Sequence, residues 1–142
     1  MIEIKQKDAI YRNFIVQGQP KGKARPRTTR TGHMYDPQEN KTYEGIVASK
    51  YLAKYAGEPV ATGYISIEIC VTMTIPKSTP KKHRIELLKA PPLKKPDLDN
   101  VAKIIMDGLN GVAYKDDAQV TSLTIYRVWG DTPQVEVWIL GG

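Results

Sequence analysis

Five aspartates fall within one short stretch of this 142-residue chain, "KKPDLDNVAKIIMDGLNGVAYKDDAQV". Asp97 and Asp99 stand two apart ahead of an amphipathic run, Asp107 lies within that run, and Asp116 and Asp117 follow it. Carboxylates gathered in one place repel one another unless a cation lies among them. A hard divalent ion such as Mg²⁺, bound through oxygen ligands, would relieve that repulsion.

A plainer interpretation explains part of this stretch. Asp99 suits the N-cap of a helix, and Asp107 can pair with Lys103 one turn earlier. A cap needs only one carboxylate, so Asp97 and the Asp116/Asp117 pair stay unexplained. If the strand after this pair runs beside the helix start, the two acidic pairs approach each other. The pattern therefore predicts an Mg²⁺ site with four candidate ligands, Asp97, Asp99, Asp116 and Asp117.

Other cofactors fit the sequence poorly. The two histidines, His33 and His83, have no paired spacing and Cys70 is the single cysteine, so we expect no structural zinc site. A calcium EF-hand starting at Asp97 would place Gly108 at the position of its bidentate glutamate. The chain also lacks the Gly-rich loop of nucleotide-binding P-loops, so we expect no nucleotide cofactor.

Positive charge is concentrated in two segments of a chain whose formal net charge is +6. That charge favours a nucleic-acid partner, although solubility alone would also account for it. Each segment could be a solvated surface, but the first has no acid and is stiffened by Pro20 and Pro26. We expect both segments, about 20–34 and 77–96, to be mobile and to contact DNA phosphates. The candidate DNA-binding residues are Lys21, Lys23, Arg25, Arg27 and Arg30 in the first segment and Lys81, Lys82, Arg84, Lys94 and Lys95 in the second.

The hydrophobic pattern predicts a single α+β domain over residues 1–142. Alternating runs predict strands at 11–17, 64–75, 119–129 and 134–140, and helical spacing predicts helices at 38–56, about 80–89 and 99–109. The turn signal "GDTP" should join the last two strands into an antiparallel hairpin. We therefore expect a small mixed sheet of about four strands with helices packed on one face.

The start of the chain lacks the continuous apolar run of a signal peptide, and no apolar run reaches the length of a membrane span. We expect a cytoplasmic protein without a membrane partner.

The acidic stretch resembles the signature of the RusA family of Holliday junction resolvases. The shared pattern is Asp-x-Asp-Asn, then Lys, Asp-Gly-Leu and Asp-Asp-x-Gln, and the upstream "PKGKARPR" and "GHMYDP" are similar to the start of many members. The resemblance implies a homodimeric endonuclease that depends on Mg²⁺, with Mn²⁺ as an alternative ion. Such an enzyme nicks four-way DNA junctions symmetrically and functions in DNA recombination and repair.

The resemblance also implies roles for individual residues. Asp97, Asp99 and Asp117 would be the essential carboxylates and Lys103 the functional lysine. Asp107 and Asp116 match acidic positions of the family to which the resemblance gives no role, and we expect Asp116 to help bind the metal. A dimer suits this reaction because two opposed nicks need two sites. Two alternatives stay open: a Mg²⁺-dependent nuclease for branched DNA in general, and a non-catalytic DNA-binding protein.

Overall fold

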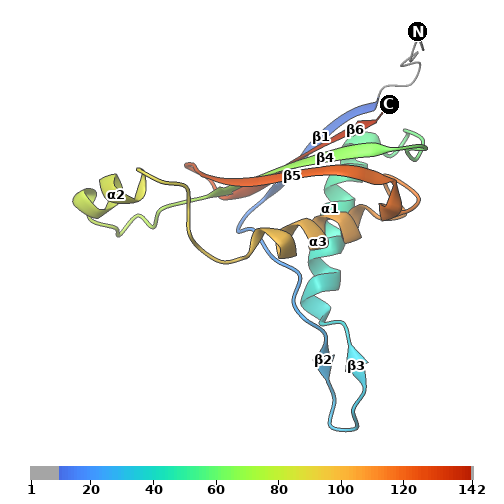
Figure 1. The fold of residues 1–142 in the computed structure, drawn as a ribbon, viewed down its shortest axis with the longest axis horizontal. Coiled ribbons are helices and arrows are strands. Elements are labelled where there is room, and N and C mark those ends of the chain that lie inside the picture. The colour runs from blue at the N-terminus through green and yellow to red at the C-terminus, as the bar shows by residue number, and fades with distance from the viewer. Residues whose placement is uncertain (1–9, 142) are drawn as a thin grey trace.

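The computed structural model describes residues 10–141, which form a four-stranded mixed sheet with two helices across one face (Figure 1). The strands are β1 (Ile10–Gln17), β4 (Ile65–Met73), β5 (Val120–Trp129) and β6 (Gln134–Gly141), in the order β1-β6-β4-β5. The helices on the sheet are α1 (Gln38–Tyr55) and α3 (Leu98–Leu109). The predicted α+β class, the strand number and the one-sided helix layer are confirmed.

The core lies between the sheet and these two helices. Every second residue of β4 is buried, from Ile65 to Met73, because alternate side chains of a strand point to the same face. The equivalent inward positions of β6, Val135, Val137 and Ile139, are also buried. Burial of each such side chain contributes about 1.5–3 kcal/mol to stability, which fixes the face that β4 turns toward the helices.

Helix α3 presents a single apolar face to this core. Val101, Ile104, Ile105 and Leu109 recur at helical spacing and are all at most 1% exposed. Gly108 lies against α1, where an added Cβ would stand 3.0 Å from both the Glu44 carbonyl oxygen and the Val47 Cβ. The two helices therefore cross in close contact, which fixes the position of α3 beneath the sheet.

The last two strands reverse direction at residues 130–133, as the turn signal predicted, but they do not pair with each other. Strand β4 lies between them, parallel to β5 and antiparallel to β6. Strand β6 continues on its other side to β1. The expected local hairpin is thus corrected, because a turn signal determines where the chain reverses and not which strand becomes the hydrogen-bonded neighbour.

Two parts project from this body (Figure 1). The first is a ribbon of β2 (Arg27–Thr28) and β3 (Met34–Tyr35), which overlaps the first of the two segments that we expected to be mobile. The second contains α2 (Lys81–Leu87), which buries none of its residues. The indole N–H of Trp129 donates to the carbonyls of Leu87 (3.1 Å) and Ala90 (2.9 Å) and holds this second part to the sheet. None of the helices described is both long and apolar enough to cross a membrane.

Candidate active site

The first acidic pair lies at the start of α3. Asp97 occupies the N-cap position and Asp99 lies in the first turn, so the cap falls two residues earlier than the sequence suggested. The Asp97 side chain accepts no hydrogen bond from the helix backbone. Both side chains are exposed. Neither carboxylate is therefore needed to complete the helix, although both benefit from the positive end of its dipole.

Cations surround Asp97. The Lys95 ammonium donates to both of its carboxylate oxygens, at 2.8 and 3.0 Å. This hydrogen bond and the charge of Lys95 lower the pKa of Asp97, and the guanidinium of Arg127 lowers it further. Arg127 also donates to the carbonyl of Lys94, so β5 holds the segment that leads into α3. Asp97 is consequently ionised at neutral pH and available to a metal ion or to a phosphate-bound cation.

The second acidic pair lies in a short 3-10 turn, η1 (Asp117–Gln119), which leads into β5. Asp116 caps this turn: its carboxylate accepts from the Ala118 N–H at 3.0 Å, while the Gln119 side chain accepts from the Asp116 N–H at 3.1 Å. The bond from Ala118 lowers the pKa of Asp116. A hydrogen bond shared with Asp116 raises the pKa of Asp117, with further contributions from the negative charges of Asp116 and Asp107.

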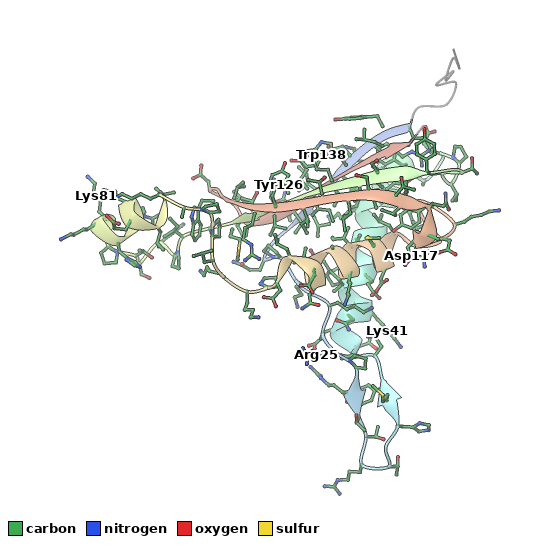
Figure 2. The ribbon with its side chains drawn as sticks, viewed as in Figure 1. Arg25, Lys41, Lys81, Asp117, Tyr126 and Trp138 are labelled. Atoms are coloured by element: carbon green, nitrogen blue, oxygen red, sulfur yellow. The ribbon has the colours of Figure 1, made fainter. Side chains whose placement is uncertain are left out.

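Tyr114 shows which end of α3 this second pair occupies. Burial raises the pKa of its hydroxyl, and the charges of Asp117 and Asp107 raise it further. The same hydroxyl donates to the Met106 carbonyl at 2.8 Å, in the last turn of α3. Figure 2 shows Asp117 at the end of α3 that lies away from α2. Asp107, Asp116 and Asp117 therefore gather near the helix end, opposite to the start that carries Asp97 and Asp99.

The expected convergence of the four carboxylates is therefore wrong for a single chain. The twelve residues of α3 separate the two pairs, because β5 begins beside the helix end and not beside its start. Asp99 and Asp107 alone are about 12 Å apart along the axis at the usual helical rise. Within residues 10–141 no three His, Cys, Asp or Glu side chains lie close enough to hold a metal ion. Carboxylate oxygens are suitable ligands for Mg²⁺, but within one chain the two acidic pairs lie too far apart to bind the same ion.

Lys103 lies halfway between the two acidic pairs. It is exposed, and it shares one stripe of α3 with Asp99 and Asp107 because the three stand four residues apart. Among the described residues it forms no ion pair. Its ammonium is thus free to bind a phosphate that lies along the stripe.

The predicted DNA-binding residue Lys23 instead lies within an ion-pair network. Its ammonium is 2.5 Å from Glu44, 2.9 Å from Asp107 and 4.0 Å from Asp36. Partial burial lowers the pKa of Lys23, but the hydrogen bonds to Glu44 and Asp107 outweigh this effect and raise the pKa to about 12. Lys23 ties the N-terminal segment to α1 and α3, and its charge is already neutralised before any DNA is bound.

The other predicted DNA-binding residues occupy two regions of the surface. In the first, Lys21, Arg25 and Arg30 are exposed, and Arg27 is exposed but paired with Glu39 on α1 at 2.6 Å. In the second, Lys81, Lys82, Lys94 and Lys95 are exposed around α2 and the start of α3, whereas Arg84 is half-buried and donates to the Pro76 carbonyl. Both groups of cations lie near the start of α3, because the base of the first contacts Asn100 and the second leads directly into the helix.

The sequence reasoning missed several charged residues near this helix. Arg127 reaches Asp97 from β5, and Asp36 and Glu44 surround Lys23. The sequence did contain a signal for Arg127. It lies on the same face of β5 as Ile125 and Trp129, at a position where the alternating pattern would lead one to expect an apolar residue. Asp36 lies in the "GHMYDP" stretch, but the resemblance gave it no role, and no pattern marks Glu44. The contacts of both with Lys23 join distant segments of the chain.

Helix α3 thus has an exposed face with Lys103 at its centre, acidic residues near both ends and cations near its start, an arrangement suited to contact with a nucleic-acid backbone. Comparison with known proteins gives the particular family. The family model described as "Endodeoxyribonuclease RusA" matches residues 17–140, which include every candidate site residue. The chain belongs to this family and is, by class, an endodeoxyribonuclease.

The chain is also similar to the Uncharacterized protein YqaN of Bacillus subtilis (strain 168). The two are 37% identical, and the match covers 89% of this chain and 93% of the relative. The resemblance to the RusA family that the acidic stretch suggested is confirmed by the family model over residues 17–140.

Proposed function

We propose that this protein is a Mg²⁺-dependent, structure-specific endonuclease that resolves Holliday junctions by paired symmetric nicks in DNA recombination and repair. The observation that supports this most is the exposed face of α3. Asp97 and Asp99 lie at its start, Lys103 at its centre and Asp107 at its end, close to Asp116 and Asp117 of η1. Only one such face exists among the described residues, whereas a four-way junction must be cut at two points.

A homodimer would account for both the separated acids and the paired cuts. In a two-fold dimer, each contact that one copy makes is repeated by the other. If the axis crosses α3 near Lys103, the helix start of one copy meets the helix end of the other. Asp97 and Asp99 of one copy would then join Asp116 and Asp117 of the second, and two equivalent sites would result.

Each residue has a defined part in this proposal. The four aspartates would hold Mg²⁺, or Mn²⁺ as an alternative, and the bound ion would supply an activated water and charge stabilisation for phosphodiester hydrolysis. Lys103 would bind the scissile phosphate and hold it along the α3 stripe. Lys95 and Arg127 would orient the segment before α3 through their contacts with Asp97 and with the Lys94 carbonyl.

The exposed cations of the two basic segments would bind the arms of the junction. We assign backbone contacts to Lys21, Arg25, Arg27 and Arg30 near the ribbon, and to Lys81, Lys82, Lys94 and Lys95 near α2. Lys23 and Arg84 would act indirectly, since both are half-buried as well as bonded within the protein. We place the protein in the cytoplasm, where its DNA substrate would be found.

The test is cleavage of a synthetic four-way junction, with matched duplex and flapped substrates. Wild-type protein with Mg²⁺ should introduce two opposed nicks in the junction, and Asp99→Asn and Asp117→Asn should abolish them. Asp131→Asn, which changes an exposed aspartate in the turn between β5 and β6, serves as the control and should cut normally. Mg²⁺ should also raise the melting temperature of the wild-type protein more than that of either inactive variant.

Each alternative predicts a different outcome. Equal cutting of flaps and junctions would favour a general nuclease for branched DNA. Tight junction binding without cutting by any divalent ion would indicate a non-catalytic DNA-binding protein. Full activity in Asp99→Asn would show that cleavage does not depend on the carboxylate of Asp99.

A further inference from the structure

The ribbon of β2 and β3 projects away from the sheet, on the side of the helices (Figure 1). All residues from Arg25 to Tyr35 are exposed. An extended chain rises about 3.3 Å per residue, so the ribbon reaches about 20 Å beyond its base. Such a thin extension buries little surface of its own and therefore adds little to the stability of the domain.

The base of the ribbon is firmly held. Asn40, which is 1% exposed, donates to the Ala24 carbonyl at 2.9 Å and accepts from the Ala24 N–H at 2.8 Å. The same amide donates to the Asp36 carboxylate at 2.7 Å. One buried side chain thus ties together Ala24, three residues before β2, and Asp36, which directly follows β3. These hydrogen bonds fix the position of the ribbon base relative to α1.

The base also lies next to the acidic helix. The Lys23 N–H donates to the Asn100 carbonyl at 2.8 Å, in the first turn of α3. Gly22 is so close that an added Cβ would stand 3.0 Å from the Cβ atoms of both Asn100 and Pro96. DNA bound at the start of α3 would therefore have the ribbon beside it.

The side chains of the ribbon have the chemistry of a DNA contact. Its exposed residues include Arg25, Arg27 and Arg30 and no acid. Figure 2 shows Arg25 at the base of the ribbon. Neither Arg25 nor Arg30 has an ion-pair partner within the described residues. Unpaired guanidinium groups on a narrow extension suit the phosphates that line a groove or a branch point.

Two exposed apolar side chains accompany these arginines. Met34 is 69% exposed and Tyr35 is 47% exposed. Tyr35 lies opposite Arg27 and Met34 lies opposite Thr28 in the ribbon register. Because neighbouring residues of a strand point to opposite faces, the ribbon presents the tyrosine on one face and the methionine on the other.

An open branch point matches this arrangement better than a continuous duplex. Stacked bases in a duplex offer only their edges, whereas the arms that meet at a branch point expose the flat faces of their terminal base pairs. Aromatic rings stack on such faces, and methionine is among the apolar side chains that proteins insert between bases. A two-faced ribbon could contact one base pair on each side.

We propose that the β2–β3 ribbon inserts at the branch point of DNA, with Tyr35 and Met34 packed against exposed base pairs and the arginines on the flanking phosphates. This inference rests on the proposed function and adds the element that selects branched DNA over duplex. It assigns that selectivity to residues far in sequence from the acidic stretch.

The test compares a Met34→Ala/Tyr35→Ala double variant with wild type for binding to a four-way junction and to a duplex, without divalent ions. Junction affinity should fall about fivefold or more, since stacking on one base contributes about that much. Duplex affinity should be unchanged. Tyr35→Phe retains the ring and should bind like wild type. Tyr11→Ala, which removes a tyrosine that is 67% exposed on β1, is the matched control and should also bind normally.

A fluorescent base analogue, 2-aminopurine, placed at the branch point gives a second readout. Wild-type protein should change its fluorescence, and the double variant should not do so even at saturation. Equal loss of junction and duplex binding would overturn the inference, as would wild-type behaviour in both assays. Wild-type protein that neither binds nor cuts branched DNA would instead refute the proposed function. Thermal melting of every variant checks that the fold is intact.

Discussion

The separation of the two acidic pairs leads to a direct test of a site shared between two chains. Two oxygens bound to one Mg²⁺ at about 2.1 Å lie no more than about 4 Å apart. The α3 axis alone separates Asp99 from Asp107 by about 12 Å, and Asp117 lies near Asp107. Ligands from both ends of one helix therefore cannot meet on one ion within one chain.

Mixing two inactive variants should then restore activity. In a dimer of Asp99→Asn with Asp117→Asn, one site receives an intact helix start from the second variant and an intact helix end from the first. Random pairing gives heterodimers as about half of all dimers, each with one working site of two. Nicking should recover to about one quarter of the wild-type rate, whereas paired resolution should not recover because no dimer has two working sites.

The assay measures nicks and paired cuts on a labelled four-way junction after the two variants are refolded together. A mixture of Asp97→Asn with Asp99→Asn is the matched control. Both changes affect the acidic pair at the start of α3, so no chain in any dimer has this pair intact and no activity should return. Recovery in this control, or none in the first mixture from variants that still dimerise, would refute the shared site.

Three further predictions concern the supports of the site. Lys23→Met leaves three carboxylates without their counter-charge and should lower the free energy of unfolding, measured in urea at pH 7, by about 1–3 kcal/mol. The exposed Lys41→Met is the control and should change this free energy little. Because folding raises the pKa of Lys23 from 10.5 to about 12, this contribution is complete below pH 10.5 and is lost as the pH rises through about 12; a constant difference across that range would contradict the assignment. Asn40→Ala removes the hydrogen bonds to Ala24 and Asp36 and should also lower the free energy of unfolding by about 1–3 kcal/mol. Amide hydrogen exchange at the ribbon base should be faster, and unchanged exchange would show that Asn40 does not hold the ribbon. Trp129→Phe removes two hydrogen bonds to the segment around α2 and should speed tryptic cleavage there, whereas Trp138→Phe on the open sheet face should not.

Features with a local cause were predictable from the sequence. The alternation in β4 and the apolar stripe of α3 each follow from one periodicity, so both elements and their buried faces were predicted correctly. The acidic residues could also be singled out as candidates by their density, and their part in binding a metal stays a prediction. The ribbon was missed because strands of two residues have no periodicity to detect.

Features that depend on distant contacts were not predictable. Whether Asp117 approaches Asp99 depends on which end of α3 the start of β5 meets, and no residue in the acidic stretch determines this. The burial of Asn40 and the ion pairs of Lys23 depend on how the N-terminal segment crosses α1 and α3. The pairing of β6 with β1 and β4 likewise joins segments more than sixty residues apart.

The inner position of β6 has a consequence for how the protein is made. A ribosome delivers β1 first and β6 last of the four strands, yet β6 is the strand that bonds β1 to the rest of the sheet. While synthesis is under way, β1 has no sheet neighbour, and the core beneath it cannot close. Non-local strand pairing is slow, and unpaired strand edges are prone to aggregation. The edges of β1 and β4 must therefore avoid pairing with other chains until β6 emerges. A product that stops before β6 would lack the completed sheet, so an unfinished copy of a DNA-cutting protein would not reach its folded form.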